Sequence, residues 1–203
     1  MLDRLNAEQL QAGIGGAVIG REIIVLEQTA STNDAILQIG NAKPKQGLVV
    51  FAEHQTAGRG QRGNRWESAT GKGLWFSILL QPGIALANSA RLTAWAAEAI
   101  SGAIQNEFAL TPTIKPPNDV QIDGRKVAGV LVEMRAQKEA AHLAIAGIGV
   151  NVNQSLEDFP KELRDKAVSL AMTLGRQVDR QKFTIALLRE LDRTYRERFA
   201  CNA

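Results

Sequence analysis

Three strand-like segments follow one another between residues 120 and 152, and a two-residue turn joins the first two. The segment VQI is followed by Asp123-Gly124, then by RKVAGVLVEMR, and AHLAIAGIGVNV comes next. Asp-Gly favours the tight turn of an antiparallel hairpin, because both residues tolerate positive φ. The third segment is expected to pair as a further strand. Strands that are neighbours in sequence argue against strict β–α–β alternation.

The remaining pattern places helices between groups of strands. Strands are predicted over 21–27, 47–53 and 73–80, and an extended segment over 111–115, where Lys115 precedes a proline. Helices are predicted in the first twenty residues, from Ser31 or Thr32 to residue 39, over 85–108, and after Pro160. The last helix carries an apolar residue at every fourth position, namely Phe183, Leu187, Leu191, Tyr195 and Phe199. The sequence therefore predicts an α+β fold with a mixed, largely antiparallel central sheet flanked by helices.

Composition narrows the class of protein. The chain has 203 residues and a net charge of +3, and no apolar run approaches the roughly 20 residues of a membrane span. Its one cysteine, Cys201, can form neither an internal disulfide nor a cysteine-based metal site. The N-terminus lacks the basic start and apolar run of a signal peptide. We expect a cytoplasmic protein that does not bind membranes.

Residues 57–66, AGRGQRGNRW, are called the Gly/Arg loop below. The loop satisfies G-x-G-x-x-G, but a strand follows it, with no room for the helix that a dinucleotide site needs. No Lys-Ser/Thr pair follows the last glycine, so it is not a P-loop either. One interpretation is an exposed flexible loop. The other is a phosphate site, in which glycines allow close approach, arginines donate to an anion and Trp66 faces a purine.

Several segments resemble those of biotin–protein ligases, the adenylating relatives of lipoate ligases. The Gly/Arg loop is similar to their Gly-Arg-Gly-x-x-Gly-x-x-Trp signature, and further similar segments follow the family order from residue 21 to Phe199. They are Thr29-Ala30-Ser31-Thr32-Asn33, Gln55, Lys115-Pro116-Pro117-Asn118-Asp119, the run from Gly124 to Glu133, and Gly147-Ile148-Gly149-Val150-Asn151-Val152-Asn153.

The resemblance implies a reaction in two steps. Biotin and ATP, with Mg²⁺, would form biotinyl-5′-AMP, and a lysine of a biotin carboxyl carrier protein or domain would then take the biotin. It also implies a catalytic domain like those of class II aminoacyl-tRNA synthetases. Two anions must meet in the first step, and at about 4 Å their repulsion is roughly 4 kcal/mol at an effective dielectric of 20. A fixed cation is therefore expected between them.

The resemblance also implies roles for individual residues. The implied catalytic residues are Lys126 and Arg59. The implied biotin-binding residues are Ser31, Thr32, Asn33, Gln55, Arg59, Gly60, Gln61, Lys126, Gly129 and Gly147. The implied ATP-binding residues are Gly58, Arg62, Asn64, Arg65, Trp66, Asn118 and Asn151, and the implied metal ligands are Asp119 and Asn151. Without the resemblance, these residues suit a helix cap, a core tryptophan, a turn or a strand bulge.

The chain departs from the family pattern at three positions and at both ends. Gln61 and Asn64 replace frequent basic residues, and Pro116 replaces a tryptophan. Residues 1–20 are expected to be an extension without a DNA-binding domain, and 21–203 the catalytic domain, without the SH3-like domain that follows it in many relatives. A monofunctional ligase that does not bind DNA is therefore expected. Dimerisation through a sheet edge is common in the family, and a homodimer stays open.

Two alternatives remain beside the biotin ligase. A lipoate or octanoate ligase could use a similar lysine on the same fold, although cysteine-dependent octanoyl transfer is disfavoured because Cys201 lies in the tail. The other alternative is a catalytically weak module that binds biotin or a nucleotide. Gln61, Pro116 and the short C-terminal region motivate it.

Overall fold

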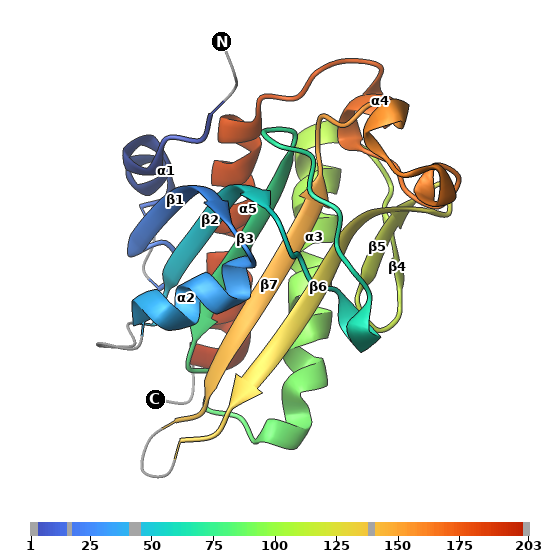
Figure 1. The fold of residues 1–203 in the computed structure, drawn as a ribbon. Helices are drawn as coiled ribbons and strands as arrows, with labels where there is room; N and C mark the ends of the chain where they lie inside the picture. The colour runs from blue at the N-terminus through green and yellow to red at the C-terminus, as the bar shows by residue number, and fades with distance from the viewer. Residues whose placement is uncertain (1–3, 16–17, 41–45, 138–140, 201–203) are drawn as a thin grey trace.

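One seven-stranded sheet runs through the protein, with the strands in the order β1-β2-β3-β7-β6-β5-β4 (Figure 1). The computed structural model describes residues 4–15, 18–40, 46–137 and 141–200, so Cys201 lies outside the described residues. The strands are β1 (Glu22–Thr29), β2 (Leu48–Gln55), β3 (Gly73–Leu80), β4 (Thr113–Lys115), β5 (Asp119–Ile122), β6 (Arg125–Arg135) and β7 (Leu143–Asn151). Only β1 and β2 pair in parallel among these neighbours. The predicted mixed, largely antiparallel sheet is confirmed.

The hairpin between β5 and β6 turns at the predicted dipeptide. Asp123 and Gly124 have φ angles of 50° and 74°, so both occupy the left-handed region that a tight hairpin turn requires. β6 then pairs with β7 from Ala128↔Val150 to Arg135↔Leu143. The predicted run of neighbouring antiparallel strands is thus present, and it forms one half of the sheet.

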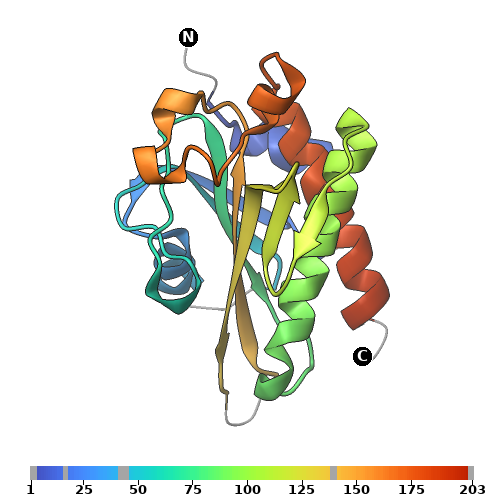
Figure 2. The same cartoon turned by 90° about the vertical axis from the view of Figure 1, so that its right-hand side faces the viewer.

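Helices cover both faces of the sheet. They are α1 (Ala7–Ile14), α2 (Thr32–Gly40), α3 (Ser89–Phe108), α4 (Leu170–Leu174) and α5 (Arg180–Tyr195). The long helices α3 and α5 lie on one face and α2 on the other (Figure 2). Most buried apolar side chains lie between the sheet and the α3–α5 layer, and a small cluster lies under α2. Of the described helices, none combines the length and apolar character that crossing a membrane requires.

The apolar stripe predicted for the last helix is buried. Phe183, Leu187, Leu191 and Tyr195 are all at most 1% exposed. The backbone changes to a π-helical turn over Arg196–Ala200, and Phe199 still packs edge-on against the ring of Trp95, 6.0 Å between centroids. The stripe therefore continues past the end of α5.

A buried ion pair ties α5 to the strands. Arg180 and Glu53 lie 2.7 Å apart, and Arg180 also donates to the carbonyl oxygens of Gly71 and Gly73. Removing one partner of such a pair leaves an uncompensated buried charge, at a cost of about 3–5 kcal/mol. The pair therefore fixes the start of β3, where the chain returns from the Gly/Arg loop.

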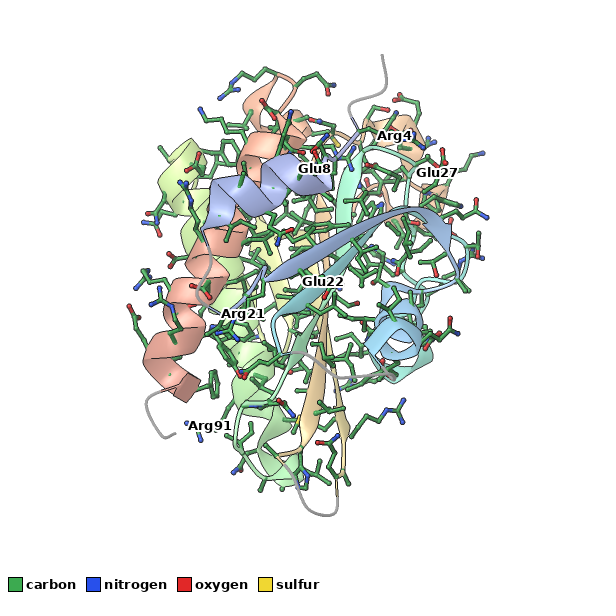
Figure 3. All side chains as sticks on the ribbon, turned by 90° about the vertical axis from the view of Figure 1, so that its left-hand side faces the viewer. Arg4, Glu8, Arg21, Glu22, Glu27 and Arg91 are labelled. Carbon is green, nitrogen blue, oxygen red and sulfur yellow. The ribbon has the colours of Figure 1, made fainter. Side chains whose placement is uncertain are left out.

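The N-terminal segment packs along β1 and α5 through α1. Arg4 forms an ion pair with Glu27 of β1, and Figure 3 shows both side chains at the same end of that strand. Both side chains are more than half exposed, so the pair stabilises the fold only slightly. The short helix predicted in the first twenty residues is confirmed.

Burial of the single tyrosine predicts how stability depends on alkaline pH. Burial raises the pKa of Tyr195 to about 12, against its ordinary value of 10.0, because the phenolate would lose its hydration. Above pH 10 the unfolded chain ionises first, so the folded state should lose stability as pH rises from about 10 towards 12. Difference absorbance of the phenolate should give a midpoint near 12 for the folded protein. A midpoint near 10 before unfolding would contradict this packing.

Candidate functional site

Three glycines form a floor on the α2 face of the sheet, called the glycine floor here. Gly129 pairs with Gly149, and Gly147 lies two residues before Gly149 on the same face. A Cβ at Gly147 would lie 2.3 Å from Asn33 Oδ1, and one at Gly149 would lie 2.5 Å from the ring of Trp66. The strand register is continuous at both positions, so neither glycine is a bulge. The missing side chains make room for groups that lie directly on the sheet.

One end of the floor is lined by uncharged polar side chains. Gln55, at the end of β2, accepts hydrogen bonds through Oε1 from Thr32 N (2.8 Å) and Thr32 Oγ1 (3.2 Å) at the start of α2. Ser31, Thr32 and Gln55 are at most 9% exposed. Among the described residues, none hydrogen bonds to Ser31 Oγ or Gln55 Nε2. Two polar groups therefore remain for a neutral ligand.

Asn33 is held by residues to which the sequence analysis gave no role. Its Oδ1 accepts from Ser77 Oγ at 2.6 Å, and its Nδ2 donates to Glu133 Oε2 at 2.6 Å. Ser77 Oγ also lies 2.8 Å from Thr32 Oγ1. A signal for Ser77 was available, because it is the one polar residue in the apolar strand GLWFSILL.

The Gly/Arg loop is an ordered, hairpin-like excursion across the same face. Arg59 and Arg65 form an antiparallel bridge, Gly60 N donates to Asn64 O, and Trp66 N donates to Gly58 O. A Cβ at Gly58 would lie 2.6 Å from the carbonyl oxygen of Trp66. The loop contains only a single 3₁₀ turn (Gln61–Gly63), so the dinucleotide interpretation is excluded by geometry as well.

Carboxylates hold the guanidinium of Arg59. Its nitrogens donate to both oxygens of Asp34, at 2.5 and 2.8 Å, and to Glu133 Oε2 at 3.3 Å. The hydrogen bond from Arg59 holds the pKa of Asp34 below its ordinary value and outweighs the effect of burial. The side chain of Arg59 therefore anchors the loop, and the residue also borders the pocket on the glycine floor. Its catalytic role stays a prediction.

Trp66 and Lys126 lie together over Gly129. The Trp66 ring is in edge contact with Trp75, and its Nε1 is buried without a hydrogen-bond partner among the described residues. The Lys126 ammonium lies 5.1 Å from the centre of the Trp66 ring and 2.6 Å from Asp119 Oδ1. The ammonium is thus placed between an aromatic face and a carboxylate.

The backbone of Lys126, at the start of β6, lies beyond the part of that strand that pairs with β7. Another segment forms hydrogen bonds with it there. Lys126 N donates to Lys166 O at 2.8 Å, and Lys126 O accepts from Val168 N at 3.0 Å. The carboxamide of Asn151 also donates to the carbonyl oxygens of Lys126 and Val168 and accepts from Gln154. Its oxygen thus accepts one hydrogen bond and keeps a second lone pair. The metal and ATP roles of Asn151 both stay predictions.

Three pockets meet at Lys126 and Trp66, which border all of them. The polar pocket lies on the glycine floor and is lined by Ser31, Thr32, Asn33, Gln55, Arg59, Gly60, Trp66, Asn118, Lys126, Gly129, Val130, Leu131, Gly147, Ile148 and Gly149. The outer pocket is lined by Asn64, Arg65, Trp66, Glu67, Lys115, Asp119, Gln121, Gly124, Lys126, Asn151, Phe159, Leu163, Asp165, Lys166 and Ala167. The loop pocket is lined by Gly60, Gln61, Arg62, Asn64, Arg65, Trp66, Lys115, Pro116, Pro117, Asn118, Asp119 and Lys126.

Most of the predicted site residues line these pockets, with two differences. Gln61, predicted to bind biotin, lies in the loop pocket and not in the polar pocket, because the 3₁₀ turn carries it away from the sheet. Gly58 borders none of the three, because it packs against the carbonyl of Trp66. The segment from Phe159 to Ala167 lines the outer pocket and was missed, since its sequence carries no motif.

The described residues contain no group of three His, Cys, Asp or Glu side chains arranged to hold a metal ion. Asp119 borders the outer and loop pockets with its carboxylate paired to Lys126. One carboxylate together with substrate phosphates is a common way of binding Mg²⁺. Asp119 therefore fits a metal ion that arrives with a nucleotide.

The polar pocket is narrow in this structure. Its volume is about 40 Å³, whereas small-molecule sites commonly measure about 300–1,000 Å³. The anchored Gly/Arg loop, including Trp66, forms the walls of this pocket that lie across from the sheet. A ligand larger than a few water molecules therefore requires these groups to shift.

Residues 25–152 match the biotin/lipoate A/B protein ligase family. The chain is 36% identical over 194 residues to the bifunctional ligase/repressor of Bacillus subtilis. The match covers 96% of this chain and 60% of that protein, so the chain spans less than two thirds of that relative. It is 33% identical over 199 residues to the biotin–[acetyl-CoA-carboxylase] ligase of Mycobacterium tuberculosis, covering 93% of this chain and 70% of the relative. It superposes on Aquifex aeolicus biotin protein ligase in complex with biotin and ATP, with a TM-score of 0.74 and 28% identity over 89% of this chain and 73% of the other.

Substitution of a floor glycine tests the geometry of the site. In Gly147→Ala the new methyl group would lie 2.3 Å from Asn33 Oδ1, so Asn33 must move and its bonds to Ser77 and Glu133 must weaken. Overpacking of this kind costs about 1–3 kcal/mol. Thermal unfolding should show that loss.

Gly102→Ala in α3 is the matched control. Its Cβ would meet Glu190 Oε1 at an ordinary 3.4 Å, and alanine favours a helix. The control should leave stability unchanged or raise it. Equal stability of Gly147→Ala and the wild type would contradict the close contact at the floor.

Proposed function

Because the chain belongs to the biotin/lipoate A/B protein ligase family, we propose that it is an ATP-dependent biotin–protein ligase. The carboxylate of biotin attacks the α-phosphorus of ATP, the bond from that phosphorus to the bridging oxygen breaks, and pyrophosphate leaves. The amine of an acceptor lysine then attacks the acyl carbon, the acyl–oxygen bond breaks, and AMP leaves as the amine loses a proton to solvent.

The position of Lys126 carries this proposal. Lys126 borders the polar, outer and loop pockets, so one cationic residue lies where the three pockets meet. Its backbone N–H donates to Lys166 O, and its carbonyl oxygen accepts from Val168 N. A cation held in this way offsets the repulsion between the biotin carboxylate and the α-phosphate without reorganisation.

The polar pocket suits the ring end of biotin. The ureido group is neutral and planar, with one carbonyl and two N–H groups, and uncharged donors and acceptors match it. Gln55 Nε2 can donate to the carbonyl, and Ser31 Oγ can bond to the ring edge, since neither atom is engaged by another described residue. The glycine floor then leads from this end to Lys126.

The loop pocket suits the phosphates of ATP. Arg62, Arg65, Lys115 and Lys126 border it, and Asp119 lies beside them. Guanidinium and ammonium groups there can bind the phosphate oxygens and the departing pyrophosphate. Asp119 would hold Mg²⁺, which neutralises phosphate charge when bound. The nucleoside then occupies the outer pocket, next to Trp66 and Asn151.

The acceptor in this proposal is a lysine of a biotin carboxyl carrier protein or domain. The printed names of relatives, biotin–[acetyl-CoA-carboxylase] ligase among them, support that choice. The expected lack of DNA binding, the cytoplasmic location and a homodimer stay predictions.

Exchange of labelled pyrophosphate into ATP tests the first step. The wild type should exchange only when biotin is present and not with lipoate. Lys126→Gln should lower the exchange rate by about 10²–10³-fold, because the charge between the two anions is lost. Lys182→Gln, an exposed position on α5 at the opposite face, should exchange normally.

Near-normal exchange by folded Lys126→Gln would remove Lys126 from its proposed role. Exchange with lipoate alone would favour the lipoate ligase. No exchange with either acid would favour the binding module.

A second variant tests how the intermediate is retained. Gln61 lies in the loop pocket among Arg62 and Arg65. Gln61→Arg adds a cation there, so biotinyl-5′-AMP should leave severalfold more slowly. Its release can be followed by chasing preformed labelled adenylate with unlabelled biotin. Unchanged or faster release would contradict the proposed position of the phosphates.

A further inference from the structure

Glu133 is part of a segment that resembles the family, yet it has no role in the chemistry proposed above. It lies on β6, on the same face as Gly129, and its side chain is 28% exposed. Its Oε2 accepts hydrogen bonds from Asn33 Nδ2 at 2.6 Å and from Arg59 Nη2 at 3.3 Å. One carboxylate oxygen therefore joins the start of α2 to the Gly/Arg loop.

Asp34 holds the same arginine from the other side. Both of its oxygens accept from Arg59, at 2.5 and 2.8 Å, in a two-point contact that fixes the plane of the guanidinium. Asp34 lies in the first turn of α2, beside Asn33. The arginine is thus held between α2 and β6. These elements are far apart in the chain, since Asn33 and Glu133 are separated by 100 residues.

Anchoring Arg59 also fixes the backbone around it. Arg59 forms the bridge to Arg65, and Gly60 next to it borders the polar pocket and hydrogen bonds to Asn64. Asn33, the second partner of Glu133, also borders the polar pocket. The two carboxylates therefore set the distance between two walls of the pocket.

We propose that Glu133 and Asp34 are positioning residues for the biotin pocket, acting through Arg59 and Asn33 without contacting either substrate. This inference rests on the proposed function. It follows that loss of either carboxylate weakens biotin binding while ATP binding and the rate at saturating biotin change little. The Gly/Arg loop also becomes more accessible before any ligand is added.

Trypsin provides a readout of the loop that needs no ligand, because Arg59, Arg62 and Arg65 are its cleavage sites within the loop. Glu133→Gln keeps the shape but removes the charge and replaces an acceptor with a donor, and Asp34→Asn does the same at the other carboxylate. Both variants should be cut in the loop about tenfold faster than the wild type. The control is Glu98→Gln, which breaks an exposed ion pair with Arg198 away from the loop and should be cut at the wild-type rate.

Calorimetry and kinetics provide the second readout. In Glu133→Gln and Asp34→Asn the Kd and KM for biotin should rise about tenfold, with the KM for ATP and kcat within about threefold of the wild type. General destabilisation would instead lower the thermal midpoint and impair both substrates. Asp34→Glu keeps a carboxylate and should recover part of the biotin affinity and of the resistance to trypsin.

Wild-type rates of loop cleavage in folded Glu133→Gln and Asp34→Asn would overturn the inference, and so would an unchanged Kd for biotin. If the wild type itself binds no biotin, the proposed function fails. The cleavage rates then still decide whether the two carboxylates hold the loop.

Discussion

The site depends on the absence of side chains at three positions in the middle of the sheet. Gly129, Gly147 and Gly149 face α2, and any Cβ there would meet Trp66, Lys126 or Asn33 at under 3 Å. These strands would otherwise be covered by apolar side chains, as they are under α2. The missing methyl groups let an amide, an indole and an ammonium lie directly against the backbone, so groups from distant segments converge within a few ångströms.

Two kinds of support surround that floor. Hydrogen bonds from Lys166, Val168 and Asn151 fix the backbone of Lys126, and Asp119 pairs with its ammonium. On the other side, Asp34 and Glu133 fix the Gly/Arg loop through Arg59. The bonds around Lys126 fix the position of its positive charge. The bonds around Arg59 set the width of the polar pocket. Each acts where a small displacement would separate the reacting groups.

The sequence was sufficient wherever the signal was local. The positive φ angles at Asp123-Gly124 suit that dipeptide, and the four-residue period from Phe183 to Tyr195 matches a buried helix stripe. Residues within recognisable motifs could also be singled out, because each motif occupies one contiguous segment, and most of them line the three pockets. Partners far apart in the chain were not found. The bonds from Arg59 to Asp34 and Glu133 depend on how α2 and β6 pack, which no single segment encodes. The side of the outer pocket from Phe159 to Ala167 has no motif and is brought there by its bridge to Lys126.

The central claim is that this chain joins biotin to the AMP part of ATP. Mass spectrometry of the purified chain mixed with biotin, ATP and Mg²⁺, beside a lipoate sample, tests it most directly. The account predicts a biotinyl-adenylate species in the biotin sample only. Absence of an adenylate in both samples, from a folded chain that binds biotin, would contradict it.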